Sequence, residues 1–307
     1  MVEVSVIIVN LNTQALLKDC LRSVSQSSVS KEIIVVDNGS TDGSVSMVKE
    51  EFPFVRILCN TSNEGFAKPN NEAMKLARGR YYFLMNSDAQ LLPNSLERLV
   101  SFADDHVDVG LCGPQLLNPD GTIQPSCRGF VSLWTHFCDM FILDRLFPNS
   151  HLFAKSEMTF FDHRSTRQVD HVMAAAVLVR SEVVKSVGMF DEELSLYYND
   201  MDWSWRIKSA GWKILFHPAA QVGHRGGSTT QILNRSFELF DEQYKNFFYY
   251  LRKHYSQAAV ALAKFLIVIG FFFRLAYWSS RSLLDSSADT AYMRRFCLKS
   301  FAVGLPL

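Results

Sequence analysis

The chain has 307 residues, of which 48% are hydrophobic and 20% are charged, with 31 basic and 31 acidic side chains. This length is ample for one large domain or two small ones, and the neutral total excludes a protein that binds nucleic acid through a general basic charge. The charge is unevenly placed, because the segment from Lys245 to the end carries nine Lys or Arg side chains against Asp285 and Asp289. The tail therefore has a net charge of +7 and the first 244 residues a net charge of −7. This separation of charge predicts that the tail contacts a different partner from the one that the body contacts.

Short β-branched runs alternate with helical patterns through the first 120 residues. Strands are predicted at residues 4–9, 32–37, 55–59 and 81–85, and the helices between them start near Thr13 and run through Glu51 and Ala77. Apolar runs of this length, separated by helices, are typical of parallel strands buried on both faces of one open sheet with right-handed crossovers. We therefore predict an α/β fold.

Polar residues follow each of these four strands. They are Asn10 and Asn12, then Asp37 to Asp42, then Asn60, Asn63 and Gly65, and finally Asn86, Ser87 and Asp88. In open α/β sheets ligands bind beyond the carboxyl ends of the strands. Turn chemistry would explain one or two polar ends, whereas four in succession favour a binding site.

The middle of the chain is less regular. The stretch 116–124 predicts a hairpin around Asp120 and Gly121, and residues 130 to 165 mix aromatic and turn-forming residues without a clear period. A further buried strand is predicted at 171–180, a helix at 199–211 and a strand at 212–218.

The tail differs from the body in composition. Residues 258–273 form an apolar run interrupted only by Lys264, and extension to Trp278 adds Arg274 and reaches the length of a bilayer span. Two charges and basic, aromatic flanks favour a helix that lies at the membrane interface, although a buried core helix has a similar pattern. We predict one domain over 1–240 and a basic, apolar helical tail over 241–307.

The cellular compartment is predicted from both the cysteines and the N-terminus. The six cysteines show no CxxC pair and no spacing typical of a metal site, so free, mostly buried thiols are expected. The first ten residues contain Glu3 and an apolar run too short for a secretory signal. We expect the body to be cytoplasmic, on the inner face of the cell membrane.

Three residues are candidates for the chemistry. No Gly-rich phosphate loop follows the first strand, so a bound nucleotide would need another partner for its phosphates, and Mg²⁺ or Mn²⁺ on Asp88 would provide one. Asp200, at a helix start, is a candidate general base, and His224 is a candidate neutral ligand. Each has an ordinary alternative, which is a turn for Asp88, an N-cap for Asp200 and an unremarkable loop position for His224.

Six stretches together resemble glycosyltransferase family 2, the inverting enzymes with the GT-A fold, and in particular its rhamnosyltransferase-like branch. They are SVIIVNLN, IIVVDNGSTDGS, NEGFAKPNN, YYFLMNSDAQL, FDEELSLYYNDMDWSWRIKSAGWKI and VGHRGGS, in this order over about residues 4 to 230. The resemblance implies a GT-A sheet that binds a nucleotide-sugar and a divalent metal.

The resemblance also implies roles for individual residues. Asp37 would accept a hydrogen bond from the pyrimidine ring, Asp88 would hold the metal with His224 nearby, and Asp200 would be the base. The remaining donor-binding positions would be Val9, Asn10, Asn12, Gly39, Asn63, Gly65, Lys68, Asn70, Asn86 and Ser87.

Two departures from the family pattern bear on these roles. Lys68 and Pro69 replace two glycines of the donor loop, which puts a close approach of the backbone to the donor in question, and the positive charge of Lys68 could compensate for it. Asn199 replaces a usual Glu, which removes a negative charge beside Asp200.

The expected function is inverting transfer of a sugar onto a lipid-linked saccharide in cell-surface polysaccharide synthesis, with dTDP-rhamnose as the favoured donor. A UDP-sugar donor, a nucleotidyltransferase and a catalytically inactive membrane-associated scaffold are the alternatives. Aromatic residues such as Phe247 and Phe248 before the tail are candidates for a homodimer interface or for the membrane surface.

Overall fold

The structure is a computed structural model that describes the chain except for residues 1, 195–196, 227–235, 282–297 and 299–307. The chain divides into two compact units, one formed by 1–128 with 162–239 and the other by 129–161 with 240–307. The segment 129–161, which the sequence left unassigned, therefore belongs with the C-terminal residues. The domain boundary after residue 240 stays a prediction.

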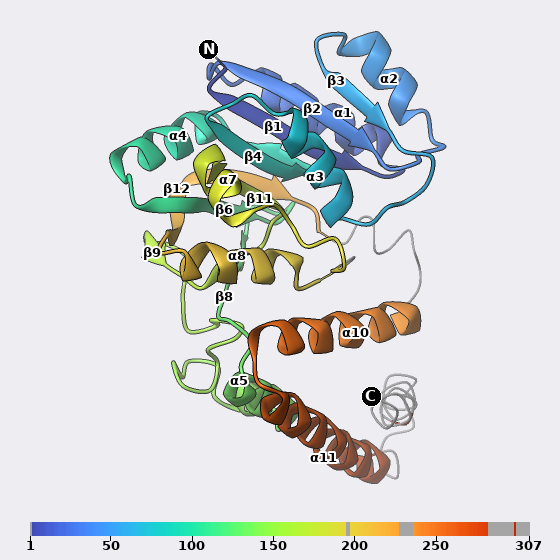
Figure 1. The fold of residues 1–307 in the computed structure, drawn as a ribbon, viewed down its shortest axis with the longest axis vertical. Helices are drawn as coiled ribbons and strands as arrows, with labels where there is room; N and C mark the ends of the chain where they lie inside the picture. Colours follow the sequence, from blue (N-terminus) through green and yellow to red (C-terminus); the bar gives the residue numbers. More distant parts are fainter. Residues whose placement is uncertain (1, 195–196, 227–235, 282–297, 299–307) are drawn as a thin grey trace. The chain divides into compact units, whose positions relative to one another are not determined.

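The first unit is built on one mixed sheet with the order β3-β2-β1-β4-β11-β6-β12-β5, and β7 and β9 pair with β6 and β12 (Figure 1). Helices α1 to α4, α7 and α8 accompany this sheet. Its strands are β1 (Val4–Asn10), β2 (Lys31–Asp37), β3 (Arg56–Cys59), β4 (Tyr81–Asn86), β5 (Ala89–Leu91), β6 (Val109–Leu117), β7 (Ile123–Gln124), β9 (Arg167–Gln168), β11 (Ala176–Arg180) and β12 (Lys213–His224). The helices are α1 (Gln14–Ser25), α2 (Ser44–Glu51), α3 (Ala67–Leu76), α4 (Ser95–Asp105), α7 (Ser181–Val187) and α8 (Asn199–Ser209).

The first four strands are parallel, as predicted. Asn10 pairs with Asp37, and Val9 pairs with both Val36 and Asn86, so the carboxyl ends of β1, β2 and β4 lie level. Helix α1 packs Leu17, Leu21 and Val24 into the core, with the three- and four-residue spacing that buries one helical face. The polar residues after these strands are thereby brought to one edge of the sheet.

The single strand predicted over 171–180 is wrong. The chain forms β10 (His171–Val172), which pairs with β8 (Cys127–Arg128), and then β11, which runs antiparallel to β4 and β6. Residues 173–175 separate the two strands. The apolar run could not reveal this break, because both strands and the connection between them are buried.

Strand β12 is longer than the strand predicted over 212–218. It continues past Pro218 to His224, with a register shift between His217 and Gln221 where it pairs with β6. Such an irregularity accommodates a proline within a sheet. His224 is therefore the last residue of a strand, and its prediction as a loop residue is wrong. The predicted hairpin is confirmed, since β6 and β7 pair antiparallel around Gly121 at a φ of 81°.

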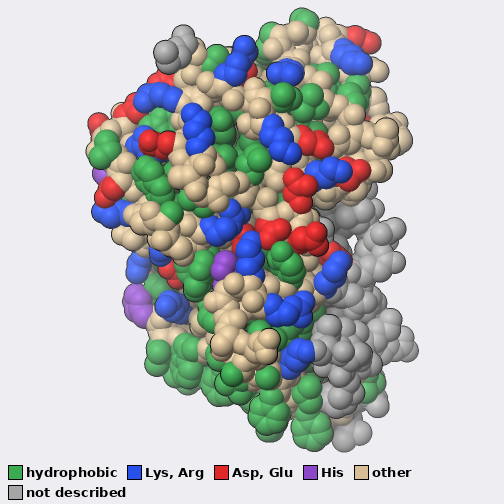
Figure 2. All heavy atoms as spheres, in the orientation of Figure 1, with side chains coloured by type: hydrophobic (Ala, Val, Ile, Leu, Met, Phe, Trp, Pro, Cys, Tyr) green, Lys and Arg blue, Asp and Glu red, His purple; other side chains and the backbone are tan. Residues whose placement is uncertain are grey.

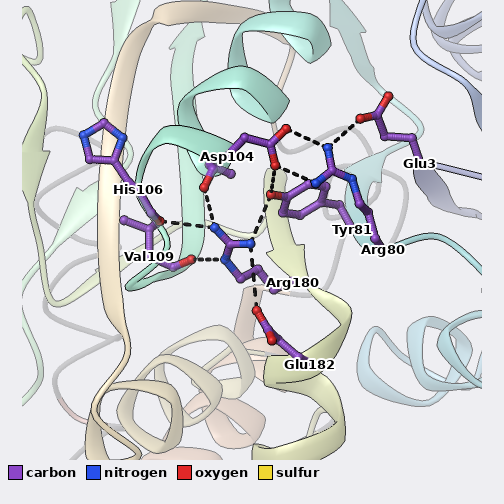
Figure 3. Close-up of polar contacts among 9 residues, drawn as sticks. Glu3, Arg80, Tyr81, Asp104, His106, Val109, Arg180 and Glu182 are labelled. Carbon is purple, nitrogen blue, oxygen red and sulfur yellow. Dashed lines mark hydrogen bonds and ion pairs between the residues drawn. The ribbon is translucent and has the colours of Figure 1, made fainter.

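A cluster of charged and aromatic residues connects four elements at the amino end of β4, at the opposite end of the strand from Asn86 (Figure 3). The Arg180 guanidinium donates to the carbonyls of Val109, Ala103 and His106 and to the Tyr81 hydroxyl. Arg80 donates through two nitrogens to the Asp104 carboxylate at 2.6 Å each. Burial, together with the hydrogen bond to Asp104, raises the pKa of Tyr81 to about 12.

This cluster predicts an acid-dependent contribution to stability. Hydrogen bonds from Arg80 lower the pKa of Asp104 below its usual value of 3.8, so the stabilisation is present above that value and is lost as the pH falls through the lower folded-state pKa. Because the pair is partly exposed and solvent screens it, Asp104→Asn is expected to cost about 1 kcal/mol at pH 7. Denaturant unfolding at pH 7 and near pH 3 measures the difference, which should shrink in acid. Asp105→Asn, at the exposed neighbouring position, is the control, and an undiminished difference near pH 3 would contradict the assignment.

The second unit contains α5 (Leu133–Met140), α6 (Leu143–Leu146), α10 (Ser236–His254) and α11 (Gln257–Arg281), where α10 begins just before the boundary. A side chain at Gly270 of α11 would collide with Met140, since its Cβ would lie 2.9 Å from the Met140 Cβ. Arg274 donates to the carbonyls of Asp139 and Met140 at the end of α5, where a helix favours positive charge. The two helices are therefore held together by close packing and by charge.

Residues 257–280 of α11 are long and apolar enough to cross a membrane, and about a quarter of the most apolar stretch, 28%, is buried. A core helix of a soluble protein can meet the same criteria of length and composition.

The five cysteines within the described ranges are free and four of them are buried, as predicted.

Candidate active site

The ends of β1 and β2 are joined by buried side chains. Asn10 is fully buried and donates to Asp37 Oδ1 at 2.9 Å and to the Ser40 hydroxyl at 3.1 Å, while Thr13 donates to Asn10 Oδ1 at 2.6 Å. The Ser40 amide donates to the other Asp37 oxygen at 2.8 Å. Asn10 thus orients Asp37, and each carboxylate oxygen keeps further acceptor capacity for a ligand. Ser87, after β4, joins the network through Thr13, with 2.8 Å between the hydroxyls.

The turns after these strands have conformations that need particular residues. Asn12 has a φ of 50°, and its side-chain oxygen accepts from the Thr41 amide at 2.8 Å. Gly39 has a φ of 85°, and a Cβ there would lie 3.0 Å from the Ser62 Cα, so glycine allows the two loops to approach. Val9 is half-buried within β1, beside this edge.

Asn38 organises the third loop. The sequence placed it in the polar stretch after β2 and indicated no individual role for it. Its side chain donates to Asn63 Oδ1 and to the Gly65 carbonyl, both at 2.9 Å, and accepts from the Glu64 amide at 3.1 Å. The loop of Asn63 and Gly65 is therefore fastened to the end of β2. Only the residue type could have indicated this role, because a buried Asn beyond a strand requires partners.

The position with the clearest departure from the family pattern, Lys68, lies in the first turn of α3. Its ammonium group is 2.8 Å from Glu64, and this hydrogen bond raises the pKa of Lys68. Pro69 follows in the same turn, where proline is tolerated. Asn70 is buried and donates to the Phe66 carbonyl at 2.8 Å. The charge of Lys68 is therefore balanced locally, and its contact with a donor stays a prediction.

The candidate metal residues Asn86, Asp88 and His224 lie together. Antiparallel pairing of β5 with β12 sets His224 opposite Ala89, so that His224 Nε2 is 3.4 Å from Asp88 Oδ1 and 3.3 Å from Asn86 Nδ2. The side chains of Asp88 and His224 are 9% and 6% exposed. A carboxylate and an imidazole separated in sequence by more than a hundred residues are thus adjacent and nearly buried.

Gln124, which the sequence did not indicate as a site residue, determines which imidazole nitrogen of His224 carries the proton. Its side-chain oxygen is 2.6 Å from His224 Nδ1, while its amide nitrogen donates to Asn118 Oδ1 at 2.9 Å and to the His224 carbonyl at 3.3 Å. An amide oxygen only accepts, so Nδ1 carries a proton, and in the neutral imidazole Nε2 is then the acceptor. No sequence pattern distinguishes Gln124 from other residues of a short hairpin.

These residues fit a divalent cation. His224 Nε2 and Asp88 Oδ1 are both acceptors, and two acceptors 3.4 Å apart are stabilised by a shared cation. Neighbouring ligands of an octahedral Mg²⁺ lie about 3.0 Å apart, because each bond is about 2.1 Å. No cluster of three or more His, Cys, Asp or Glu with metal-binding geometry occurs among the residues that the structure describes. The remaining ligands would therefore be water and substrate oxygens, as is common for Mg²⁺.

Asp200 lies in the first turn of α8, after two residues with left-handed backbones. Tyr197 and Tyr198 have φ values of 60° and 59°, and such positions cost on the order of 1–3 kcal/mol each and concentrate at functional sites. The Asp200 oxygens accept from the amides of Met201 at 2.9 Å and Ala174 at 3.3 Å. The carboxylate is thereby held in one orientation with lone pairs to spare.

Asp202 has a different role from its neighbour. It is fully buried and accepts from Arg206 Nε at 2.9 Å, while Arg206 also donates to the carbonyls of Val187 and Met189. This ion pair fastens α8 to the preceding loop. Of the two acids that begin the helix, Asp200 is the more accessible one.

His171 is a further titratable group near Asp200 that the sequence analysis did not single out. It is fully buried, and burial lowers its pKa, although the negative charge of Asp200 acts in the opposite direction. Burial therefore disfavours a positive charge on this neighbour of the carboxylate. A single histidine in an apolar strand gives no sequence signal for such a place.

Residues 173–175 lie between Asp200 and the end of β4, beyond which Asp88 lies. The Ala174 amide donates to Asp200, and the Ala175 carbonyl accepts from the Asn86 amide at 2.9 Å. Asp88, two residues beyond Asn86, and Asp200 therefore lie at the same end of the sheet. That end also carries the network of Asn10 and Asp37, so the structure brings the predicted strand-end residues together.

Comparisons with known proteins show the family of this chain and its fold. The family model described as Glycosyl transferase family 2 matches residues 5–169, more than half of the chain. The N-acetylglucosaminyl-diphospho-decaprenol L-rhamnosyltransferase of Mycobacterium tuberculosis is 28% identical over 209 residues, which cover 64% of this chain and 67% of that protein.

Two solved structures show the same fold at low identity. The mannosyltransferase PcManGT from Pyrobaculum calidifontis, in complex with GDP-Man and Mn²⁺, is 14% identical with a TM-score of 0.57, over 99% of this chain and 86% of that one. TarS 1–349 from Staphylococcus aureus is 15% identical with a TM-score of 0.55, over 99% and 81% of the two chains. The chain belongs to glycosyltransferase family 2 and has the GT-A fold.

Proposed function

We propose that this protein transfers a sugar from a nucleoside diphosphate to a lipid-linked saccharide, with inversion at the anomeric carbon. The observation that carries the proposal is the placement of the pair Asp88 and His224 and the carboxylate Asp200 at one end of the sheet, on either side of residues 173–175. Asp88 and His224 are suited to hold a metal ion against the diphosphate, and Asp200 is suited to accept the proton of an attacking hydroxyl.

The donor is expected to lie across the strand ends. Asp37 would accept from the pyrimidine ring, Asn63 and Gly65 would line the ribose, and Asp88 with His224 would hold Mg²⁺ or Mn²⁺ against the diphosphate. A divalent cation stabilises the negative charge that grows on the leaving nucleoside diphosphate.

Asp200 is proposed as the general base. It would take the proton of the acceptor hydroxyl as the oxygen attacks the anomeric carbon from the face opposite the diphosphate. One displacement of this kind inverts the configuration and needs no covalent enzyme intermediate. The two backbone amides that hold Asp200 would keep the carboxylate aligned with the hydroxyl, and such alignment is a large part of catalysis.

The favoured donor is dTDP-rhamnose. The support is that the mycobacterial relative is named as an L-rhamnosyltransferase, acting on a decaprenol-linked N-acetylglucosamine. A UDP-sugar remains the alternative, because the structure of TarS has been solved with UDP. In addition, a single carboxylate beside the pyrimidine ring, that of Asp37, accepts a hydrogen bond equally from thymine and from uracil. The acceptor would be a polyprenyl-diphosphate saccharide, held at the inner face of the cell membrane by the basic tail.

Calorimetric titration with dTDP, UDP and GDP, each with and without Mn²⁺, tests the proposal. Metal-dependent binding of dTDP in preference to UDP would support a rhamnosyl donor, and preference for UDP would replace the sugar but keep the reaction. A folded protein that binds none of the three would overturn the proposal in favour of an inactive scaffold.

Gln124 is expected to set the metal affinity of this site through the tautomer of His224. Gln124→Leu removes the acceptor at Nδ1, so the imidazole can rotate or exchange its proton position, and Mn²⁺ affinity in the presence of a nucleoside diphosphate should fall about 10- to 100-fold. Gln124→Glu keeps an acceptor at the same place and should retain most of the affinity. Titration followed by the electron paramagnetic resonance of free Mn²⁺ measures this directly.

Gln90→Leu is the matched control, because Gln90 is exposed on the adjacent strand β5. It should bind Mn²⁺ like the unmodified protein. If Gln124→Leu also bound like the unmodified protein, the hydrogen bond to Nδ1 would have no part in metal binding.

A further inference from the structure

Large hydrophobic side chains are exposed mainly on the second unit. In the 129–161 segment they are Trp134, Leu146, Phe147 and Leu152, with exposed fractions of 41% to 67%, and on α11 they are Leu262, Phe265, Phe272 and Phe273, with fractions of 45% to 61%. The described residues of the first unit add Phe54, Val107 and Tyr197. Figure 2 shows hydrophobic side chains gathered over the part of the molecule that α5 and α11 form.

Ring contacts join the two sets into one aromatic band. In order along it, the rings are Phe147, Phe153, Trp134, Phe137, Phe141, Phe273 and Phe272, and neighbouring centroids are 4.7 to 6.2 Å apart. Each of these rings is at least partly exposed. The band therefore crosses from the 129–161 segment to α11 at the contact of Phe141 with Phe273, two residues more than a hundred positions apart in sequence.

The exposed side of α11 is additional to the side that packs within its unit. Val260, Ala263, Ile267 and Phe271 recur at helical spacing and are buried, and Gly270 and Arg274 contact α5. The packing of this helix is therefore already satisfied by one face. A second apolar face on the same helix, rich in Phe, indicates contact with another apolar phase.

The chemistry of the band and of the tail suits a lipid bilayer. Tryptophan is favoured at the boundary between headgroups and acyl chains, and Phe and Leu are typical of the apolar face that interfacial helices bury just below it. The Trp134 indole N–H donates to the Leu152 carbonyl at 2.9 Å, so the ring can leave water without an unsatisfied donor. The excess of nine basic over two acidic side chains from Lys245 onward complements anionic headgroups.

We propose that the 129–161 segment and α11 together form the membrane-binding surface, with the aromatic band inserted at the boundary between the lipid headgroups and the acyl chains. The inference deepens the proposed function, since it rests on a lipid-linked acceptor, and it gives the 129–161 segment a role in bringing the chain to that acceptor. Membrane binding then depends on side chains in the middle of the sequence as well as on the tail.

Co-sedimentation of the full chain with vesicles of equal parts phosphatidylglycerol and phosphatidylcholine tests the proposal. The double variant L146S/F147S is expected to lower the partition coefficient at least about tenfold, because binding scales with inserted apolar area. The matched control is F54S/V107S, which removes two similarly exposed side chains from the first unit and should bind within about twofold of the unmodified chain. Phospholipid brominated on its acyl chains should quench tryptophan fluorescence, and Trp134→Phe should remove part of this quenching.

The outcomes separate this inference from the proposed function. Titration of each variant with nucleoside diphosphate and Mn²⁺ reports the donor site independently of vesicles, so loss of vesicle binding with intact titration supports the surface alone. Unchanged vesicle binding by L146S/F147S, or equal loss in the control, would overturn the inference. If L146S/F147S had a smaller molar mass than the unmodified chain in light scattering, with vesicle binding unchanged, the aromatic band would be an interface between two copies of the chain.

Discussion

Replacement of Asp88 by asparagine is expected to abolish metal-dependent binding of the nucleoside diphosphate. The substitution preserves the size of the side chain but removes the negative charge, leaving the cation with His224 and neutral ligands only. Transfer activity should fall on the order of 10²- to 10³-fold, because stabilisation of the leaving group is worth several kcal/mol. Isothermal titration with and without Mn²⁺, followed by initial rates with the donor that binds, measures both effects.

The control for this experiment is a carboxylate outside the site. Asp105→Asn, on the exposed end of α4, should leave binding and rate unchanged within error. Retention of Mn²⁺-dependent binding by Asp88→Asn would place the cation away from β4 and β12, and the interpretation of the strand-end site would then fail.

Replacement of Asp200 by asparagine is expected to slow the chemical step and leave donor binding intact. The amide keeps the hydrogen bonds available from Ala174 and Met201 but accepts no proton. The value of kcat should fall on the order of 10²- to 10⁴-fold, with the nucleoside diphosphate Kd within about twofold of the original. The pH profile of kcat/KM should also lose its acidic limb, which a purely structural effect would not cause.

Asp202→Asn provides the contrast within the same helix turn. Asp202 is buried against Arg206, so its replacement leaves a guanidinium without its charge partner and is expected to cost about 1–3 kcal/mol of stability. The loss should appear in the denaturant midpoint, with kcat per folded molecule much less affected than in Asp200→Asn. If Asp202→Asn instead lost turnover at unchanged stability, Asp202 would be the better candidate for the base.

Much of the first half of the fold could be predicted, because its information is local. The β-branched runs and the helical patterns alternate regularly, and in a parallel sheet this alternation also sets the direction of every strand. Once the four strands are parallel, Asn10, Asp37 and Asn86 must lie at one edge, and the structure places them there. The second half was harder to predict, because β11 runs antiparallel to β4 and the connection at 173–175 that precedes it is as apolar as the strands around it.

The contacts that orient the chemical groups were not predictable from the pattern. Gln124 and His224 are a hundred residues apart and meet because β6 pairs with both β7 and β12. Asn38 and His171 likewise have partners that only long-range pairing provides. Hydrogen bonds of this kind depend on positions to within a few tenths of an ångström, and residue spacing along a chain carries no such information.

The sequence by itself determined the α/β class, the parallel first half, the polar edge beyond its strands and the contrast between an acidic body and a basic, apolar tail, because propensity, periodicity and charge are properties of short segments. The tertiary structure decided that His224 ends a strand beside Asp88, that Gln124 selects its tautomer, and that residues 129–161 join α11 in one aromatic band. These features depend on which distant segments become neighbours, and that is determined by the packing of the whole chain.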